Sequence, residues 1–313
     1  MNFKQPQKAY TPIKSISHSV VIPCSRPTRL PQILGALAKQ TVSLSHTEII
    51  IAAPRQPTTI SIPANIHIAW AETGQLHPPG HMRNLGATQA RGNILFFIDD
   101  DCIPPADWME TLHSTLNTMP QVGAVGCRVV STQNDFWSRC ADFVLFSATQ
   151  QIFSCHRLLG CGALAVRREA FEKVQGFDTS LLASEDWDFG LRLQQAGWLS
   201  YFNANVTVLH DHARGHFTAI MRQAWQSGWQ SGLTVQNKHY NTLGPSSRMA
   251  MRLTRSPFYP LFGFPYAMAV TLLHAWEMRG SDPRWLLFIP FLAIGRFAYQ
   301  LGVWRRIRHD HSL

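Results

Sequence analysis

Short apolar runs alternate with amphipathic stretches over the first two thirds of the chain. Runs rich in β-branched and aromatic residues predict buried strands at 19–23, 48–53, 66–70, 94–98, 122–130 and 161–166, and an alternating segment predicts another at 201–210. Apolar residues at helical spacing, with start and stop signals, predict helices at 29–40, 83–90, 106–119, 168–175 and 184–193. Strands that alternate with helices predict an α/β fold with a mostly parallel, doubly wound sheet.

The last third of the chain has a different pattern. Residues 256–276 contain no Asp, Glu, Lys or Arg, and about twenty apolar residues suffice to cross a bilayer. A second apolar stretch, 285–304, is interrupted by Arg296. Flanking arginines and border tryptophans fit a hairpin with both ends in the cytosol (Trp276, Trp285, Trp304). Prolines in the first stretch and Arg296 in the second leave open another interpretation, two helices that pack on the rest of the protein or lie on the membrane surface.

We therefore expect a polar N-terminal extension (1–18), an α/β domain (19–240) and a helical, membrane-associated region (241–313). The extension lacks the apolar core of a signal peptide, and the six cysteines lack the spacing of a disulfide framework or a zinc site, so we expect the α/β domain to face the cytosol. The formal net charge of +9 suits an anionic lipid or a phosphorylated substrate. We exclude nucleic acid, because there is no known reader motif and the basic residues flank apolar segments.

An acidic triplet, Asp99, Asp100 and Asp101, directly follows the predicted strand 94–98. Adjacent carboxylates repel one another unless a cation lies among them, and Mg²⁺ and Mn²⁺ prefer oxygen ligands from carboxylates, phosphates and water. Ligands of α/β sheets bind at the carboxyl ends of the strands, where this triplet lies. The triplet therefore indicates a divalent metal site, although a solvated acidic turn would have the same residues.

A second acidic cluster begins the predicted helix 184–193, where Ser184 precedes Glu185, Asp186 and Asp188. Acids in a first helical turn are stabilised by the helix dipole, so ordinary helix chemistry explains the cluster without a function. The same dipole would keep Asp186 ionised, as a general base requires. Both interpretations stay open on these residues alone.

Several short motifs follow one another in the order found in family 2 glycosyltransferases. The chain resembles this family from about residue 19 to residue 212, at 19–23, 83–86, 90–92, 97–101, 160–163, 167–171, 176–178, 185–188, 192–193 and 197–198. The resemblance implies a GT-A fold, a Rossmann-like arrangement with a mostly parallel central sheet, here followed by an apolar helical region. It also implies an enzyme that transfers a sugar from a nucleotide-diphosphate sugar, with inversion at the anomeric carbon.

The resemblance also implies roles for the two acidic clusters. Asp99 and Asp101 match the ends of the family's DXD motif, so that Mg²⁺ or Mn²⁺ and the nucleotide ribose would be held there, with Asp100 oriented toward the nucleotide. The metal would neutralise charge on the departing diphosphate. Asp186 matches the base that takes the proton of the acceptor hydroxyl, and Glu185 would support the base or the acceptor.

Further residues match positions that contact the nucleotide in the family: Pro23, Cys24, Arg26 and Arg83. An arginine suits a diphosphate, because a guanidinium bonds phosphate oxygens in pairs. His210 and His212 point to the same side if their segment is extended, and some relatives place such a histidine on the metal. We expect His210 to contact the metal or the diphosphate, and the alternative is an ordinary histidine with a carbonyl partner.

One position departs from the family. Relatives carry an aspartate just after the second strand that reads the base, whereas this chain has Ala53 followed by Pro54. The nucleotide and the sugar are therefore left open. We expect the acceptor to be a lipid-linked or cell-envelope glycan at the cytoplasmic face of the inner or plasma membrane. Two alternatives are transfer to a polyprenyl phosphate, which needs no base, and a non-catalytic nucleotide-sugar binding protein.

Overall fold

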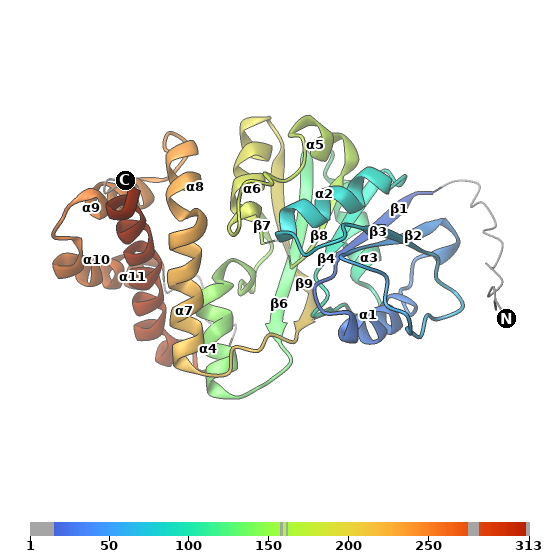
Figure 1. Cartoon of the computed structure of the whole chain (residues 1–313), viewed down its shortest axis with the longest axis horizontal. Helices are drawn as coiled ribbons and strands as arrows, with labels where there is room; N and C mark the ends of the chain where they lie inside the picture. Colours follow the sequence, from blue (N-terminus) through green and yellow to red (C-terminus); the bar gives the residue numbers. More distant parts are fainter. Residues whose placement is uncertain (1–15, 157–158, 161, 275–281, 311–313) are drawn as a thin grey trace.

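The computed structural model describes residues 16–156, 159–160, 162–274 and 282–310. Most of the predicted N-terminal extension, Cys161 and Trp276 lie outside these residues. A nine-stranded sheet forms the centre of the molecule, in the order β3-β2-β1-β4-β8-β6-β9-β5, with β7 also paired to β9 (Figure 1). The strands are β1 (His18–Pro23), β2 (Thr47–Ala53), β3 (Ile68–Glu72), β4 (Ile94–Ile98), β5 (Cys102–Ile103), β6 (Val122–Ser131), β7 (Cys155–His156), β8 (Ala163–Arg167) and β9 (Leu199–His210).

The sheet is largely parallel, as predicted. Strands β3, β2, β1 and β4 run in one direction, and β6 and β9 share it, because β8 is antiparallel to both β4 and β6. Strand β8 inserts in the reverse direction, and the short strands β5 and β7 are also antiparallel to β9. A strand buried on both faces has the same apolar pattern in either direction, so the sequence pattern did not reveal this reversal.

Helices cover both faces of the sheet. Helices α1 (Leu30–Leu37) and α3 (Trp108–Thr118) bury their apolar sides against one face, and α2 (Pro79–Gln89), α5 (Arg168–Lys173) and α6 (Glu185–Gln195) pack on the other. Each face thereby has its own apolar core. This arrangement leaves the carboxyl ends of β1, β4 and β6 between the helical layers.

Some boundaries differ from the prediction. Helix α2 begins at Pro79, four residues before the predicted start, since proline is favoured in a first helical turn. Helix α1 ends at Leu37 and strand β3 begins at Ile68, each two or three residues from the predicted limit. Helix α4 (Phe136–Leu145) and the helices between residues 217 and 238 were not predicted.

The chain after residue 216 forms a helical layer at one end of the molecule, together with α4 (Figure 1). It contains α7 (Phe217–Ser227), a π-helical turn η4 (Gly228–Gly232), α8 (Leu233–Lys238), α9 (Pro245–Arg255), α10 (Tyr259–His274) and α11 (Trp285–Asp310). A third apolar core joins α4, α7 and α11 through Phe143, Ile220 and Phe288. The helical layer is therefore packed on the α/β portion.

The predicted pair of membrane segments corresponds to α10 and α11. Within the described residues, α11 is the one helix with the length, 26 residues, and the apolar composition needed to cross a membrane, and a third of its most apolar part is buried in the protein. Helix α10 has 16 described residues and contains Pro265. Both helices expose large apolar side chains, for example Leu261, Leu273 and Leu287.

Candidate active site

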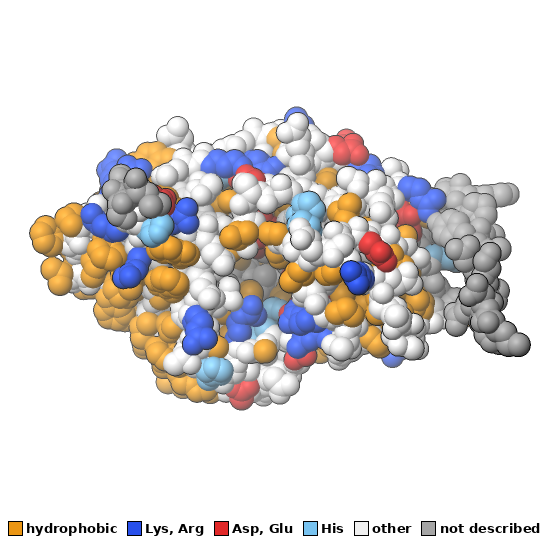
Figure 2. Space-filling view, in the orientation of Figure 1, with side chains coloured by type: hydrophobic (Ala, Val, Ile, Leu, Met, Phe, Trp, Pro, Cys, Tyr) orange, Lys and Arg blue, Asp and Glu red, His pale blue; other side chains and the backbone are white. Residues whose placement is uncertain are grey.

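The acidic triplet lies where β4 ends, at the floor of a cleft of about 250 Å³. The cleft is lined by residues from the ends of β1, β4 and β9 and from the start of α2, among them Pro23, Cys24, Arg26, Asp99, Asp100, Asp101, Phe146, His210 and Arg214. Basic and histidine side chains gather around a hollow near the middle of the molecule in Figure 2. The predicted loop after β1, the triplet and the predicted histidine are thus brought together.

Asp100 fixes the loop that follows β1. Its Oδ2 accepts hydrogen bonds from the backbone amides of Ser25 and Arg26, both at 2.7 Å, and its Oδ1 accepts one from Arg26 Nη2 at 2.8 Å. Asp100 is 3% exposed. Both carboxylate oxygens of Asp100 are therefore hydrogen-bonded to the loop. The predicted effect of Asp100 on the nucleotide would act through that loop. Burial, and then the charge of Asp100, raise the pKa of the Cys24 thiol to about 12, so Cys24 is uncharged there.

Asp101 lies between a cation and a histidine. Arg26 Nη2 is 2.6 Å from Asp101 Oδ2, and His210 Nε2 is 3.4 Å from Asp101 Oδ1. Burial alone would raise the pKa of Asp101, but the hydrogen bond and charge of His210, followed by those of Arg26, hold it well below its usual range. Asp101 is thus an ionised carboxylate at neutral pH.

The donor atoms around Asp101 fit a divalent metal. One ligand atom each from Asp101, Cys102 and His210 lies within 4.8 Å of the others. Burial raises the pKa of Cys102 well above the ordinary thiol value, which leaves the carboxylate and the imidazole as the better ligands. The Nδ1 atom of His210 is buried and has no hydrogen-bond partner among the described residues. A carboxylate with an imidazole suits Mn²⁺, and Mg²⁺ would rely more on Asp101 and on donor phosphates.

Arg83 joins the two acidic clusters. Its Nη2 donates to Asp99 Oδ1 and its Nη1 donates to Glu185 Oε1, both at 2.6 Å, and the side chain is 3% exposed. Asp99 lies at the cleft floor, where burial raises its pKa and Asp101 raises it further, whereas Arg83 lowers it. The predicted nucleotide contact of Arg83 stays a prediction, because its guanidinium is engaged by these two carboxylates.

Asp186 is the second residue of α6, next to Glu185. Its Oδ1 accepts a hydrogen bond from the Trp187 amide at 2.8 Å, and the side chain is half-buried. Ser184 caps the helix without a side-chain hydrogen bond and has a left-handed backbone, with φ of 60° and ψ of 20°. A non-glycine residue in this conformation is uncommon and often marks a functional site. The helix therefore turns sharply just before the predicted base.

The cleft contains a cation that the sequence did not single out. Arg214 lines the cleft, and its guanidinium lies over the ring of Phe146, 5.4 Å from its centroid. Burial lowers the pKa of Arg214, and the charge of Asp101 partly restores it. Its signal in the sequence was weak, an arginine four residues after His210 in a loop at the carboxyl end of a strand. A cation opposite Asp101 can bind a diphosphate.

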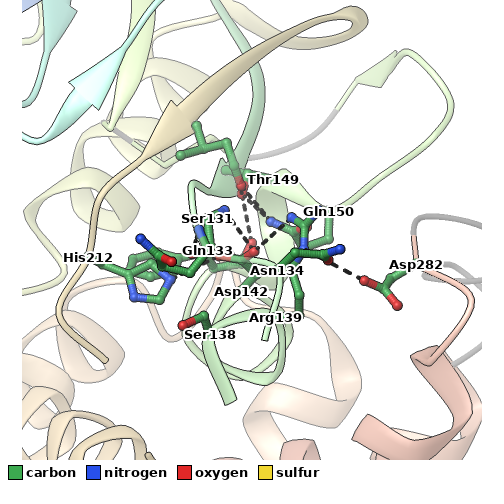
Figure 3. A network of polar contacts seen from close by, with 12 residues as sticks. Ser131, Gln133, Asn134, Ser138, Arg139, Asp142, Thr149, Gln150, His212 and Asp282 are labelled. Carbon is green, nitrogen blue, oxygen red and sulfur yellow. Dashed lines mark hydrogen bonds and ion pairs between the residues drawn. The ribbon is translucent and has the colours of Figure 1, made fainter. Parts of the chain in front are cut away.

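A buried polar network extends from the cleft to the helical layer (Figure 3). His212 Nε2 is 3.2 Å from Asp142 Oδ1 in α4, and Asp142 Oδ2 accepts from the Ser131 amide at 2.9 Å. Arg139 connects Asp142 to Asp282, which precedes α11. His212 thus hydrogen-bonds Asp142, and its ring lies 5.1 Å from that of His210.

Comparisons with known proteins identify the family of this chain. The family model of glycosyl transferase family group 2 matches residues 94–300. An uncharacterised glycosyltransferase of Haemophilus influenzae is 24% identical over 198 residues, which are 61% of this chain and 67% of that protein. An N-acetylglucosaminyl-diphospho-decaprenol L-rhamnosyltransferase of Mycobacterium tuberculosis is 46% identical over 56 residues, 18% of each chain. The chain spans 17% and 35% of the length of two other curated relatives.

A solved structure supports the same assignment of the fold. The mannosyltransferase PcManGT from Pyrobaculum calidifontis, in complex with GDP-Man and Mn²⁺, superposes with a TM-score of 0.59 at 16% identity, over 98% of this chain and 91% of that chain. Its likeness shows the GT-A fold. With a family model that covers two thirds of its length, this chain is an enzyme of glycosyl transferase family group 2.

Proposed function

We propose that this enzyme transfers a sugar from a nucleotide-diphosphate sugar to a hydroxyl of a lipid-linked or cell-envelope glycan, with inversion and with Asp186 as the general base. The observation that carries this proposal is the pair of bonds made by Arg83. Its guanidinium bonds Asp99 and Glu185 at 2.6 Å each and so links the acidic triplet to the residue next to the predicted base. The rhamnosyltransferase relative, which by its name acts on a diphospho-decaprenol sugar, supports the class of acceptor.

Each residue of the cleft would have a different role in the reaction. Asp101 and His210 would hold Mg²⁺ or Mn²⁺, which supplies positive charge to the leaving diphosphate when bound. Arg214 and the loop around Arg26 would bind the diphosphate oxygens by charge-assisted hydrogen bonds. Asp186 would remove the proton of the acceptor hydroxyl as its oxygen bonds to the anomeric carbon and the bond to the diphosphate breaks.

A donor screen followed by three variants tests this function. Donor sugars such as GDP-mannose and UDP-N-acetylglucosamine, each with and without Mn²⁺, should include one that raises the melting temperature, because a ligand at 100 times its Kd adds about 2.7 kcal/mol. With that donor, Asp101→Asn and Asp186→Asn should each lower transfer about 100-fold or more. Asp107→Asn, an exposed acid at the start of α3, is the matched control and should retain activity.

The outcomes separate the alternatives. Full transfer by Asp186→Asn would contradict the base and favour an acceptor that is already an anion, such as a polyprenyl phosphate. A metal-dependent shift without turnover on any acceptor would favour a binding protein. No stabilisation by any donor would contradict the proposed substrate class.

We also propose that α10 and α11 hold the enzyme at the cytoplasmic face of the membrane that carries the acceptor. Large apolar side chains are exposed on both helices, and they gather at that end of the molecule in Figure 2. Arginines near them, including Arg252 and Arg255 of α9, suit anionic headgroups. In a flotation assay, a smaller fraction of a Leu261→Ser/Leu273→Ser variant than of the wild type should bind phosphatidylglycerol vesicles. The control Leu76→Ser changes an exposed leucine at the cleft and should bind like the wild type.

A further inference from the structure

The π-helical turn η4 bonds directly to the segment that precedes the predicted base. The hydroxyl of Ser231 in η4 accepts hydrogen bonds from the backbone amides of Leu182 and Ala183, both at 3.1 Å. Ser231 is 2% exposed, so water does not compete for these bonds. π-Helices are rare, appear mostly as single turns within α-helices, and lie frequently at functional sites.

Helix α11 packs closely against η4. A Cβ atom at Gly228 would collide with the backbone carbonyl of Tyr299, and one at Gly232 would lie 2.8 Å from the Tyr299 hydroxyl, so the two helices touch through glycines. Ser184 and Asp186 lie near the Tyr299 hydroxyl. Ser184 is the residue with the left-handed backbone. Elements far apart in the sequence thus converge on three consecutive residues, 182–184.

Helix α8, which continues from η4, ends beside the first turn of α6 and bonds it at Asp188. Lys238 Nζ and His239 Nε2 lie 2.7 and 2.8 Å from Asp188 Oδ1, and Asp188 is fully buried. Asp188 lies one half-turn beyond Asp186 in α6. Bonds before and after Asp186 therefore come from one continuous helical segment, 228–239.

We propose that Ser231 is a positioning residue that fixes the backbone of residues 182–184 and thereby orients Asp186 toward the acceptor. The strained backbone at Ser184 needs such support, because a left-handed non-glycine residue persists only where its surroundings impose it. The helical layer is in this view a part of the active site. The orienting role rests on the proposed function of Asp186.

Hydrogen–deuterium exchange of the full chain tests the backbone part of the proposal without a substrate. In Ser231→Ala, the amides of Leu182 and Ala183 should exchange about tenfold faster than in the wild type, because their acceptor is gone. Ser227→Ala is the matched control, one turn earlier, where the hydroxyl bonds Gln223 alone among the described residues. Unchanged exchange of these two amides in Ser231→Ala would overturn the proposal.

Kinetics test the orienting part. Ser231→Ala should lower kcat about 10- to 100-fold while the KM for the donor found by the screen stays within twofold, because the base is misplaced and the donor site is intact. Ser231→Ala should add no further loss to Asp186→Asn. An equal loss in both backgrounds would overturn the proposal. If Asp186→Asn alone is fully active, the proposed base fails, and the exchange experiment still decides whether Ser231 holds the segment.

Discussion

Replacing Arg83 with methionine should destabilise the protein strongly. Methionine keeps most of the side-chain volume but leaves Asp99 and Glu185 without the guanidinium that bonds each of them at 2.6 Å. Glu185 is 10% exposed and Asp99 is 30% exposed, so water can replace the bond to Asp99 in part and the bond to Glu185 only poorly. Removing one partner of a buried ion pair costs about 3–5 kcal/mol of the free energy of unfolding, because the remaining charge stays buried.

The melting temperature measures this loss. At about 2–4 °C for each kcal/mol in a large domain, Arg83→Met should melt at least about 6 °C below the wild type. Adding Glu185→Gln removes one of the two uncompensated charges, so the double variant should recover part of the loss. The difference in melting temperature between Arg83→Met and the wild type should also shrink as the pH falls. Burial already raises the pKa of Asp99, and protonation removes the charge that Arg83→Met leaves without a partner. A loss below about 1 kcal/mol, or no recovery in the double variant, would refute this reasoning.

Three further outcomes follow from other sites. Burial, and then neighbouring histidines, lower the pKa of His18 to about 4 in the fold. Because the unfolded chain binds this proton more tightly, the free energy of unfolding should fall by about 2 kcal/mol between pH values above 6.5 and pH 5. In His18→Asn, the urea denaturation midpoint should therefore change less over that pH range. Arg214→Met should weaken binding of the donor's nucleotide diphosphate about tenfold by calorimetry, and exposed Arg222→Met should not. Gly302→Ala should lose about 1–3 kcal/mol, because its Cβ would meet the backbone of Trp225.

The sequence predicted the parallel half of the sheet and the two acidic clusters, because both depend on local patterns. A five-residue apolar run such as 94–98 predicts a buried strand, and three adjacent carboxylates at its end indicate a cation site. The family resemblance then ordered the clusters along one chain. The family and the fold were confirmed by the comparisons, whereas the roles of single residues stay predictions.

The remaining features depend on contacts between distant residues. The bonds of Asp100 to the loop after β1 are set by the pairing of β1 with β4, which the triplet itself does not encode. The turn η4 contains Gly228 and Gly232, and glycines in a sequence indicate a helix break, whereas here they let α11 approach. Arg214 lies in a loop without a motif, so its place in the cleft emerges only from the fold.

The two-residue strand β5 has a consequence for the proposed metal site. Cys102 pairs with His210 in antiparallel register, and the Asp211 amide donates to the carbonyl of Asp101 at 2.8 Å, so backbone bonds set the spacing between the carboxylate and the imidazole. A slip of one residue would turn His210 to the opposite side of its strand. If Asp101 and His210 hold the metal as proposed, an insertion in the turn between β4 and β5 would change that spacing without replacing either residue.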